Sequence, residues 1–183
     1  MWKRFLMALS VLIILGSTSL FNQLYAQTDY ESIPPEFFRR NLGGPRLGVT
    51  YLPGNGELVN KLREGKMDPV LSQFGWHFEW QVAPKGGGPA FVIEAVPLFA
   101  GVEYGKFIPS ATLAMGIRMP NGIEFGMGPN LVATGTREVK SALVLAVGKT
   151  INYSGVSLPL NLVFATNPSG QRISFIFGYA IAK

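Results

Sequence analysis

The residues between Gln73 and Val82 alternate strictly between large apolar side chains and small or polar ones. One face of this segment carries Phe74, Trp76, Phe78, Trp80 and Val82, and the other carries Gly75, His77, Glu79 and Gln81. Successive side chains of a β-strand point to opposite faces, so a period of two residues predicts a strand. The large face of this strand is aromatic, which favours a barrel whose outside contacts lipid.

The first 26 residues have the three-part layout of a secretory signal peptide. Lys3 and Arg4 precede an apolar run from Phe5 to Leu15, and a small and polar stretch then leads to Ala26, the expected last residue before cleavage. The apolar run is shorter than the roughly 20 residues that a transmembrane helix requires. The chain contains no cysteine, which excludes a lipid-anchored lipoprotein, structural disulfides and thiol catalysis.

The composition is unusual for a soluble domain. Charged residues make up 15% of the chain, where about 25% is typical. Removing Lys3 and Arg4 with the leader leaves 14 basic residues against 11 acidic ones, a net charge of +3. This small excess gives no reason to expect a nucleic-acid partner.

Eight segments fit the two-residue period, and several approach the roughly 9 to 11 residues of a tilted transmembrane strand. They are Arg46 to Leu52, Gln73 to Ala83, Ala90 to Phe99, Ser110 to Met119, Gly122 to Leu131, Val139 to Ile151, Gly155 to Thr166 and Gln171 to Lys183. The connections alternate between long and short, as expected if odd-numbered loops face outward, although the last outward loop is short. The first connection, Pro53 to Ser72, is long, whereas the fourth is little more than an Asn121-Gly122 hairpin turn.

The two faces of these strands differ in the size of their side chains. Eight strands enclose an interior just wide enough for side chains to fill, which favours small residues inside and large residues facing lipid. The candidate lipid-facing residues are Phe74, Trp76, Phe78, Trp80, Phe125, Leu145, Leu160, Phe175, Phe177 and Tyr179. A soluble barrel of lipocalin type would invert this arrangement, but the small face has too few charges to form a soluble exterior.

In this architecture the chain resembles the small eight-stranded outer-membrane β-barrel proteins of the OmpA and OmpX type. The resemblance covers about Arg46 to Lys183. The last strand contributes to it, because its large residues alternate toward the chain end as in the C-terminal strand that such proteins present to their assembly machinery. The family pattern usually ends in an aromatic residue, whereas this chain ends in Lys183. The resemblance implies an outer-membrane location, with outer-membrane lipid and the barrel assembly machinery as partners.

The small face collects a set of polar and charged residues that we predict to form a luminal network: His77, Glu79, Glu94, Arg118, Glu124 and Arg172. Charges inside a narrow lumen must pair, so we interpret the set chiefly as a salt-bridge network that plugs the barrel. A gated polar pathway or a small-ligand site is the alternative. The pattern does not decide which carboxylates pair with Arg118 and which with Arg172.

No catalytic, metal or cofactor site is predicted. His77 is the only histidine and shares a face with Glu79, so this pair can in principle orient a base, but no serine lies in a nucleophile motif. One histidine and dispersed carboxylates lack the clustered spacing of metal ligands. The glycines from Gly86 to Gly88 lack the Lys-Ser/Thr continuation of a phosphate-binding loop.

Two segments outside the strands carry their own predictions. In the first outward loop, Asn55 is expected to cap a short helix that ends before Gly65, with Leu58 and Leu62 on one face. This helix is either a lid over the barrel mouth or an exposed contact site. Before the barrel, the aromatic and basic residues from Ser32 to Leu42 favour a short amphipathic turn at the membrane interface.

The sequence thus predicts three parts, a signal peptide over 1–26, a periplasmic or interfacial segment over 27–45 and a β-barrel over 46–183. The predicted fold class is an all-β, eight-stranded antiparallel up-and-down transmembrane barrel. The predicted function is non-enzymatic, a structural or binding role in the cell envelope through the outward loops, with an extracellular partner that the sequence does not identify. The alternatives are a soluble periplasmic or secreted barrel that binds an apolar ligand, and a narrow channel.

Overall fold

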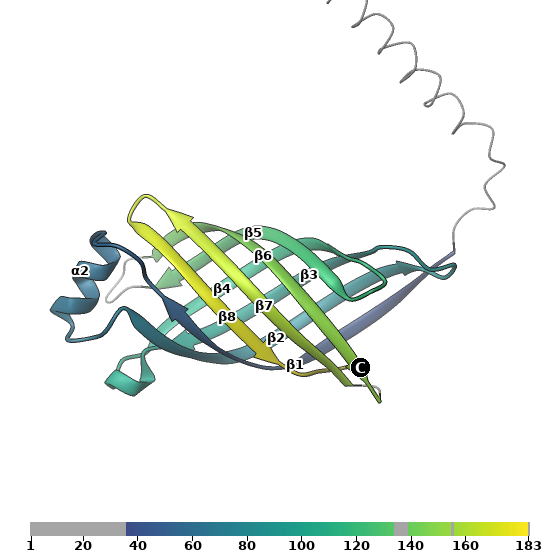
Figure 1. Ribbon diagram of the computed structural model, residues 1–183, viewed down its shortest axis with the longest axis horizontal. Coiled ribbons are helices and arrows are strands. Elements are labelled where there is room, and N and C mark those ends of the chain that lie inside the picture. Colours follow the sequence, from purple (N-terminus) through teal and green to yellow (C-terminus); the bar gives the residue numbers. More distant parts are fainter. Residues whose placement is uncertain (1–35, 134–138, 155, 183) are drawn as a thin grey trace, which may run out of the picture. The chain divides into compact units, whose positions relative to one another are not determined.

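The computed structural model describes residues 36–133, 139–154 and 156–182, which fold as a closed antiparallel β-barrel (Figure 1). The strands are β1 (Phe37–Tyr51), β2 (Val70–Pro84), β3 (Ala90–Ala100), β4 (Ile108–Arg118), β5 (Ile123–Ala133), β6 (Val139–Tyr153), β7 (Val156–Asn167), β8 (Gly170–Gly178) and β9 (Ala180–Ala182). Each of β1 to β7 pairs with the next strand along the chain, and β1 closes the sheet by pairing with both β2 and β8. The predicted signal peptide, Met1 to Ala26, lies outside the described residues.

Strands β8 and β9 are one strand that is interrupted at Tyr179. Both pair with β1, and the register of β9 continues that of β8 without an offset. The predicted eight-stranded up-and-down architecture is therefore confirmed.

Prolines account for the interruptions in the strand pairing. Pro97 lies in the gap between β2 and β3, and Pro129 lies in the gap between β4 and β5. Pro45 of β1 and Pro159 of β7 both face the step from Gly178 to Tyr179. A proline has no N–H to donate to a neighbouring strand, so the hydrogen-bond ladder breaks where it occurs.

The first strand begins earlier than the sequence predicts. The structure starts β1 at Phe37 and not at Arg46, so the predicted amphipathic turn and the boundary at residue 45 are wrong. The sequence pattern does not indicate a strand here, because two aromatic residues, Phe37 and Phe38, are followed by two basic ones, Arg39 and Arg40, without alternation. Residues 37–45 are nevertheless extended, because they pair with β2 from Pro84 back to Trp76.

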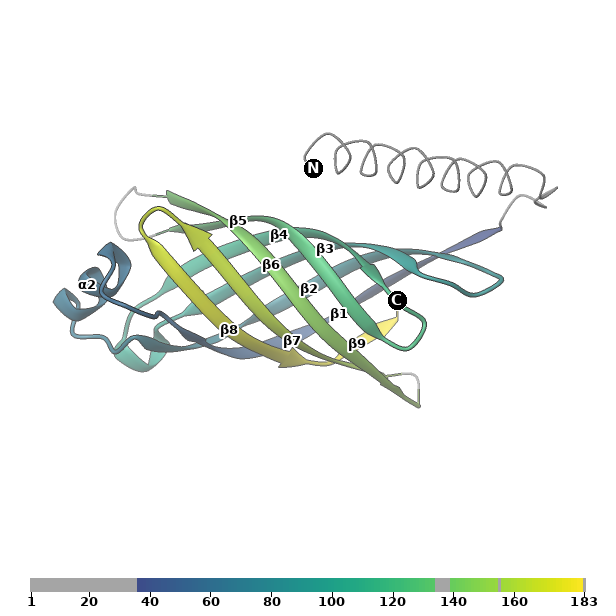
Figure 2. The same ribbon diagram turned by 45° about the horizontal axis from the view of Figure 1, so that its top comes forward.

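The long β1–β2 and β3–β4 connections lie at one end of the barrel, together with the tight β7–β8 turn, and the β2–β3 and β4–β5 turns lie at the other. Helix α2 (Glu57–Glu64) follows β1, and the short helix η1 (Val102–Tyr104) follows β3, at the same end (Figure 1). The turned view shows the β2–β3 and β4–β5 hairpins at the opposite end (Figure 2). Among the described residues, no helix is long and apolar enough to cross a membrane.

The predicted loop helix is present with a different N-terminus. Helix α2 covers Glu57–Glu64, and Gly65 follows it as expected. Its N-cap is Gly56 and not Asn55, and no side chain caps the first turn. The Asn55 side chain instead accepts a hydrogen bond from Arg63 Nη2, with 3.2 Å between Oδ1 and Nη2.

Candidate functional site

Arg118 is the centre of an ion-pair network inside the barrel. Strand pairing places Glu124 of β5 directly beside Arg118 of β4, and Glu79 of β2 directly beside Glu94 of β3. Arg118 donates from Nε to Glu124 Oε2 over 2.7 Å and from Nη2 to Glu79 Oε2 over 2.9 Å, and Nη2 also lies 3.6 Å from Glu94 Oε1. One guanidinium thus joins three carboxylates from three strands.

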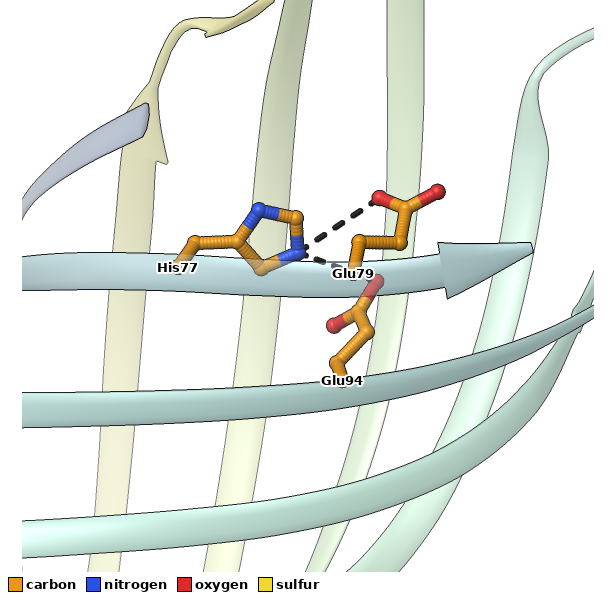
Figure 3. Close-up of side chains that lie close together, drawn as sticks. All are labelled: His77, Glu79 and Glu94. Atoms are coloured by element: carbon orange, nitrogen blue, oxygen red, sulfur yellow. Dashed lines mark ion pairs between the residues drawn. The ribbon is translucent and has the colours of Figure 1, made fainter. Parts of the chain in front are cut away.

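His77 and Arg46 extend this network toward β1. Arg46 Nη2 lies 2.7 Å from His77 Nδ1, and a guanidinium can only donate, so Nδ1 must accept this hydrogen bond. In a neutral imidazole the proton is then on Nε2. Nε2 lies 3.5 Å from a carboxylate oxygen of Glu79 and 3.5 Å from one of Glu94. Figure 3 draws both contacts as dashed lines.

The cluster of His77, Glu79 and Glu94 has the residue types of a metal site, since its ligand atoms lie within 4.8 Å of one another. Its hydrogen bonding fits an ion-pair network better. The ring nitrogen that faces the two carboxylates carries the proton, and a metal ligand must present a lone pair. Arg118 also contacts both carboxylates.

Further polar groups surround Glu124. Thr150 Oγ1 donates to Glu124 Oε2 over 3.3 Å. The Asn161 amide, oriented with its nitrogen toward acceptors, donates to Glu124 Oε1 over 2.8 Å. Glu124 thus receives hydrogen bonds from Arg118 of β4, Thr150 of β6 and Asn161 of β7.

Five of the six predicted luminal residues are in this cluster, and Arg172 is not. Arg172 Nη2 donates instead to Asn130 Oδ1 over 2.7 Å. Sequence reasoning missed Arg46, which is 3% exposed. The sequence does carry a signal for it, because Arg46 and Thr50 alternate with the outward-facing Leu47, Val49 and Tyr51, but Arg46 is only the first residue of the predicted strand.

Two cavities lie toward the opposite ends of the lumen. The cavity at the α2 end has a volume of about 620 Å³, and the one at the end with the β2–β3 and β4–β5 turns has about 280 Å³. They share no lining residue, and Arg118 lines the smaller one. Because the ion-pair network lies between them, the arrangement does not support the narrow-channel alternative.

Helix α2 packs as a lid over the larger cavity. Its apolar residues Leu58, Val59 and Leu62 are buried in one cluster with Leu52, Leu71 and Ala100. Lys140 of β6 donates to Glu57 Oε1 over 2.7 Å and to Ser169 Oγ over 2.8 Å. The backbone N–H of Leu58 also donates to the Ser169 carbonyl oxygen over 3.2 Å.

The contact between Glu57 and Lys140 gives a first prediction. Hydrogen bonds from Lys140, Ser169 and Lys61 lower the pKa of Glu57 from 4.5 to about 2. Because its pKa is lowered, ionised Glu57 stabilises the lid fully at pH values above the ordinary carboxyl pKa. This contribution is lost as the pH falls through about 2. At neutral pH, Glu57→Gln should therefore increase tryptic cleavage at Lys61 and Arg63 by about two- to fivefold.

The matched control is Glu64→Gln, which removes a charge from the last residue of the same helix. Its cleavage rate should equal that of the wild type, with both rates measured on folded protein in detergent. Equal cleavage of the wild type and Glu57→Gln would show that the ion pair does not hold the lid.

The outer surface of the barrel is apolar. All ten candidate lipid-facing residues point outward, with side chains between 38% exposed at Leu160 and 56% exposed at Phe125. The lipocalin-like alternative requires Phe74, Trp76, Phe78 and Trp80 to line an internal pocket. They instead lie on the outside of β2 and are 39% to 47% exposed, which overturns that arrangement.

Comparisons with known proteins find structural likeness only. No protein-family model matches the chain, and no curated protein matches it. Among the solved structures that match are two of Ail, the attachment invasion locus protein of Yersinia pestis, one of them in complex with the heparin analogue sucrose octasulfate. Each is 10% identical and covers 79% of this chain and 97% of the Ail chain, with TM-scores of 0.47 and 0.43.

Proposed function

We propose that this chain is a non-enzymatic outer-membrane β-barrel protein, with a structural or binding role in the cell envelope through its outward loops. The observation that carries the proposal is the apolar exterior. On β2 alone, Phe74, Trp76, Phe78, Trp80 and Val82 occupy five successive outward positions, all at least 36% exposed. Monomeric soluble proteins rarely expose a continuous apolar surface of this kind, whereas a barrel in lipid requires one.

The two ends of the barrel support the assignment of outward loops. The end with α2 and η1 carries the two long connections β1–β2 and β3–β4, although the β7–β8 turn at this end is short, and in outer-membrane barrels the longer loops face the outside of the cell. Because ion pairs interrupt the lumen, we place the proposed binding role at this loop end and do not propose a continuous pore.

The hydrogen bonding of His77 supports the absence of catalysis. Nδ1 is occupied by Arg46, and Nε2 faces two carboxylates in a position that is 2% exposed. A general base needs a free lone pair within reach of its substrate. His77 offers no such lone pair.

Fractionation followed by a gel of unboiled and boiled samples tests the proposal. The expressed full-length protein should sediment with the outer membrane, and the mature chain should migrate differently before and after boiling, because a closed barrel resists unfolding by detergent alone. A protein that is freely soluble without detergent would overturn the membrane assignment.

A further inference from the structure

We propose that the cavity beneath helix α2 binds a single-chain amphiphile with an anionic head, such as a medium-chain fatty acid. The cavity has about 620 Å³, within the range of small-molecule pockets. It lies between the lid and the lumen, and its lining includes Leu58 and Leu62 of α2 together with Thr50, Gln73 and Arg172 of the barrel. The inference deepens the binding role proposed above by naming a ligand class.

Arg172 supplies the anchor for the head group. It lines the cavity and is half-buried, and among the described residues its one hydrogen-bond partner is the neutral side chain of Asn130. Arg118, in the same lumen, contacts three carboxylates. A partly buried guanidinium without a carboxylate is costly, and an anionic ligand would provide the missing counter-charge.

The charges around the cavity favour the same ligand. Lys61, Lys106 and Lys140 line it together with Arg172, whereas Glu64 is the one acidic residue among its lining residues. Lys140 contacts Glu57 and Ser169, and the cavity as a whole keeps an excess of positive charge.

Most of the remaining lining is apolar, which argues for an amphiphile over a fully polar anion. The apolar walls include Leu58, Leu62 and Met67 on the lid side and Leu71, Ile108 and Val132 on the barrel side. Pockets of this kind bind ligands through apolar walls and use a few polar groups to fix their orientation. The alkyl chain of a fatty acid would contact the apolar walls, and its carboxylate would pair with Arg172.

Photo-crosslinking tests the site. The probe is a twelve-carbon fatty acid with a diazirine on its chain, added to the folded protein in phosphatidylcholine nanodiscs, and its methyl ester is the uncharged control. We expect the acid to label peptides that contain α2 or residues 106–108, at least about tenfold more than the ester does. Equal labelling by acid and ester, or labelling confined to outward-facing strand residues, would overturn the proposal.

Substitutions identify the anchor. Arg172→Gln should reduce cavity labelling by about tenfold, and Arg172→Lys should retain most of it, because the positive charge remains. Lys106→Gln alters an exposed loop residue of the same lining and should give a smaller reduction even if Arg172→Gln does not fold. Lys149→Gln, on the outer face of β6, is the matched control and should label as the wild type does.

The outcome is independent of the membrane test. The change in gel migration on boiling shows whether each variant is folded, and labelling is compared only among folded proteins. If folded Arg172→Gln were labelled as strongly as the wild type, the ligand site would be refuted and the membrane assignment would remain intact. A soluble protein that still labels at α2 would refute the membrane assignment and keep the site.

Discussion

Replacing Arg118 by methionine should lower the free energy of unfolding by about 3–5 kcal/mol, because the substitution leaves buried carboxylates without their counter-charge. Arg118 is the group that joins Glu79, Glu94 and Glu124, and their side chains are 2%, 19% and 12% exposed. Methionine fills a similar volume, so the loss reports mainly the uncompensated charge.

Urea unfolding in lipid vesicles, followed by tryptophan fluorescence, measures this loss, with Trp76 and Trp80 as reporters on the outside of β2. Lys149→Met is the control, because it removes a positive charge from the outer face of the barrel and should change stability by less than about 0.5 kcal/mol. Adding Glu79→Gln to Arg118→Met should recover part of the loss, since the two residues are in contact. If Arg118→Met cost no more than the control, the carboxylates would not depend on Arg118.

The strands were predictable because large and small residues alternate along nearly all of them. The predicted strand Ala90 to Phe99 differs from β3 by a single residue at its end, and Val139 to Ile151 differs from β6 by two. β1 was the exception, because residues 37–45 do not alternate and are extended through pairing with β2. Local pattern is insufficient where tertiary pairing determines the conformation.

The candidate site was predictable in composition but not in pairing. The alternation placed Glu79, Glu94, Glu124 and Arg118 on one face, and their convergence depends on barrel closure and on the stagger between strands. Arg172 shares that face, yet it pairs with Ala165 close to the turn between β7 and β8. It therefore reaches Asn130 and the cavity beneath α2. Arg172 is separated from the ion-pair network by its position along the barrel axis. The alternation pattern predicts which side chains face inward, but it does not predict how far along the axis they lie.

Replacing Leu145 by arginine should cost about 2–4 kcal/mol in the free energy of folding into lipid vesicles, whereas Tyr153→Arg should cost about 0–1 kcal/mol. Both residues lie on the outer face of β6, but Leu145 is near the middle of the strand and Tyr153 is its last residue. Strand pairing places Leu145 between Met127 of β5 and Phe164 of β7, so an arginine there has only apolar outward neighbours to either side.

The difference between these two variants tests lipid contact directly, because both introduce the same side chain on the same face of one strand. In a bilayer the cost of a charge depends on depth, and an arginine at the strand end reaches the polar interface. On a water-facing surface both substitutions would cost little and the difference would vanish. Urea unfolding of the two variants in vesicles gives this difference, and a value near zero would mean that the apolar exterior of the barrel does not face the bilayer core.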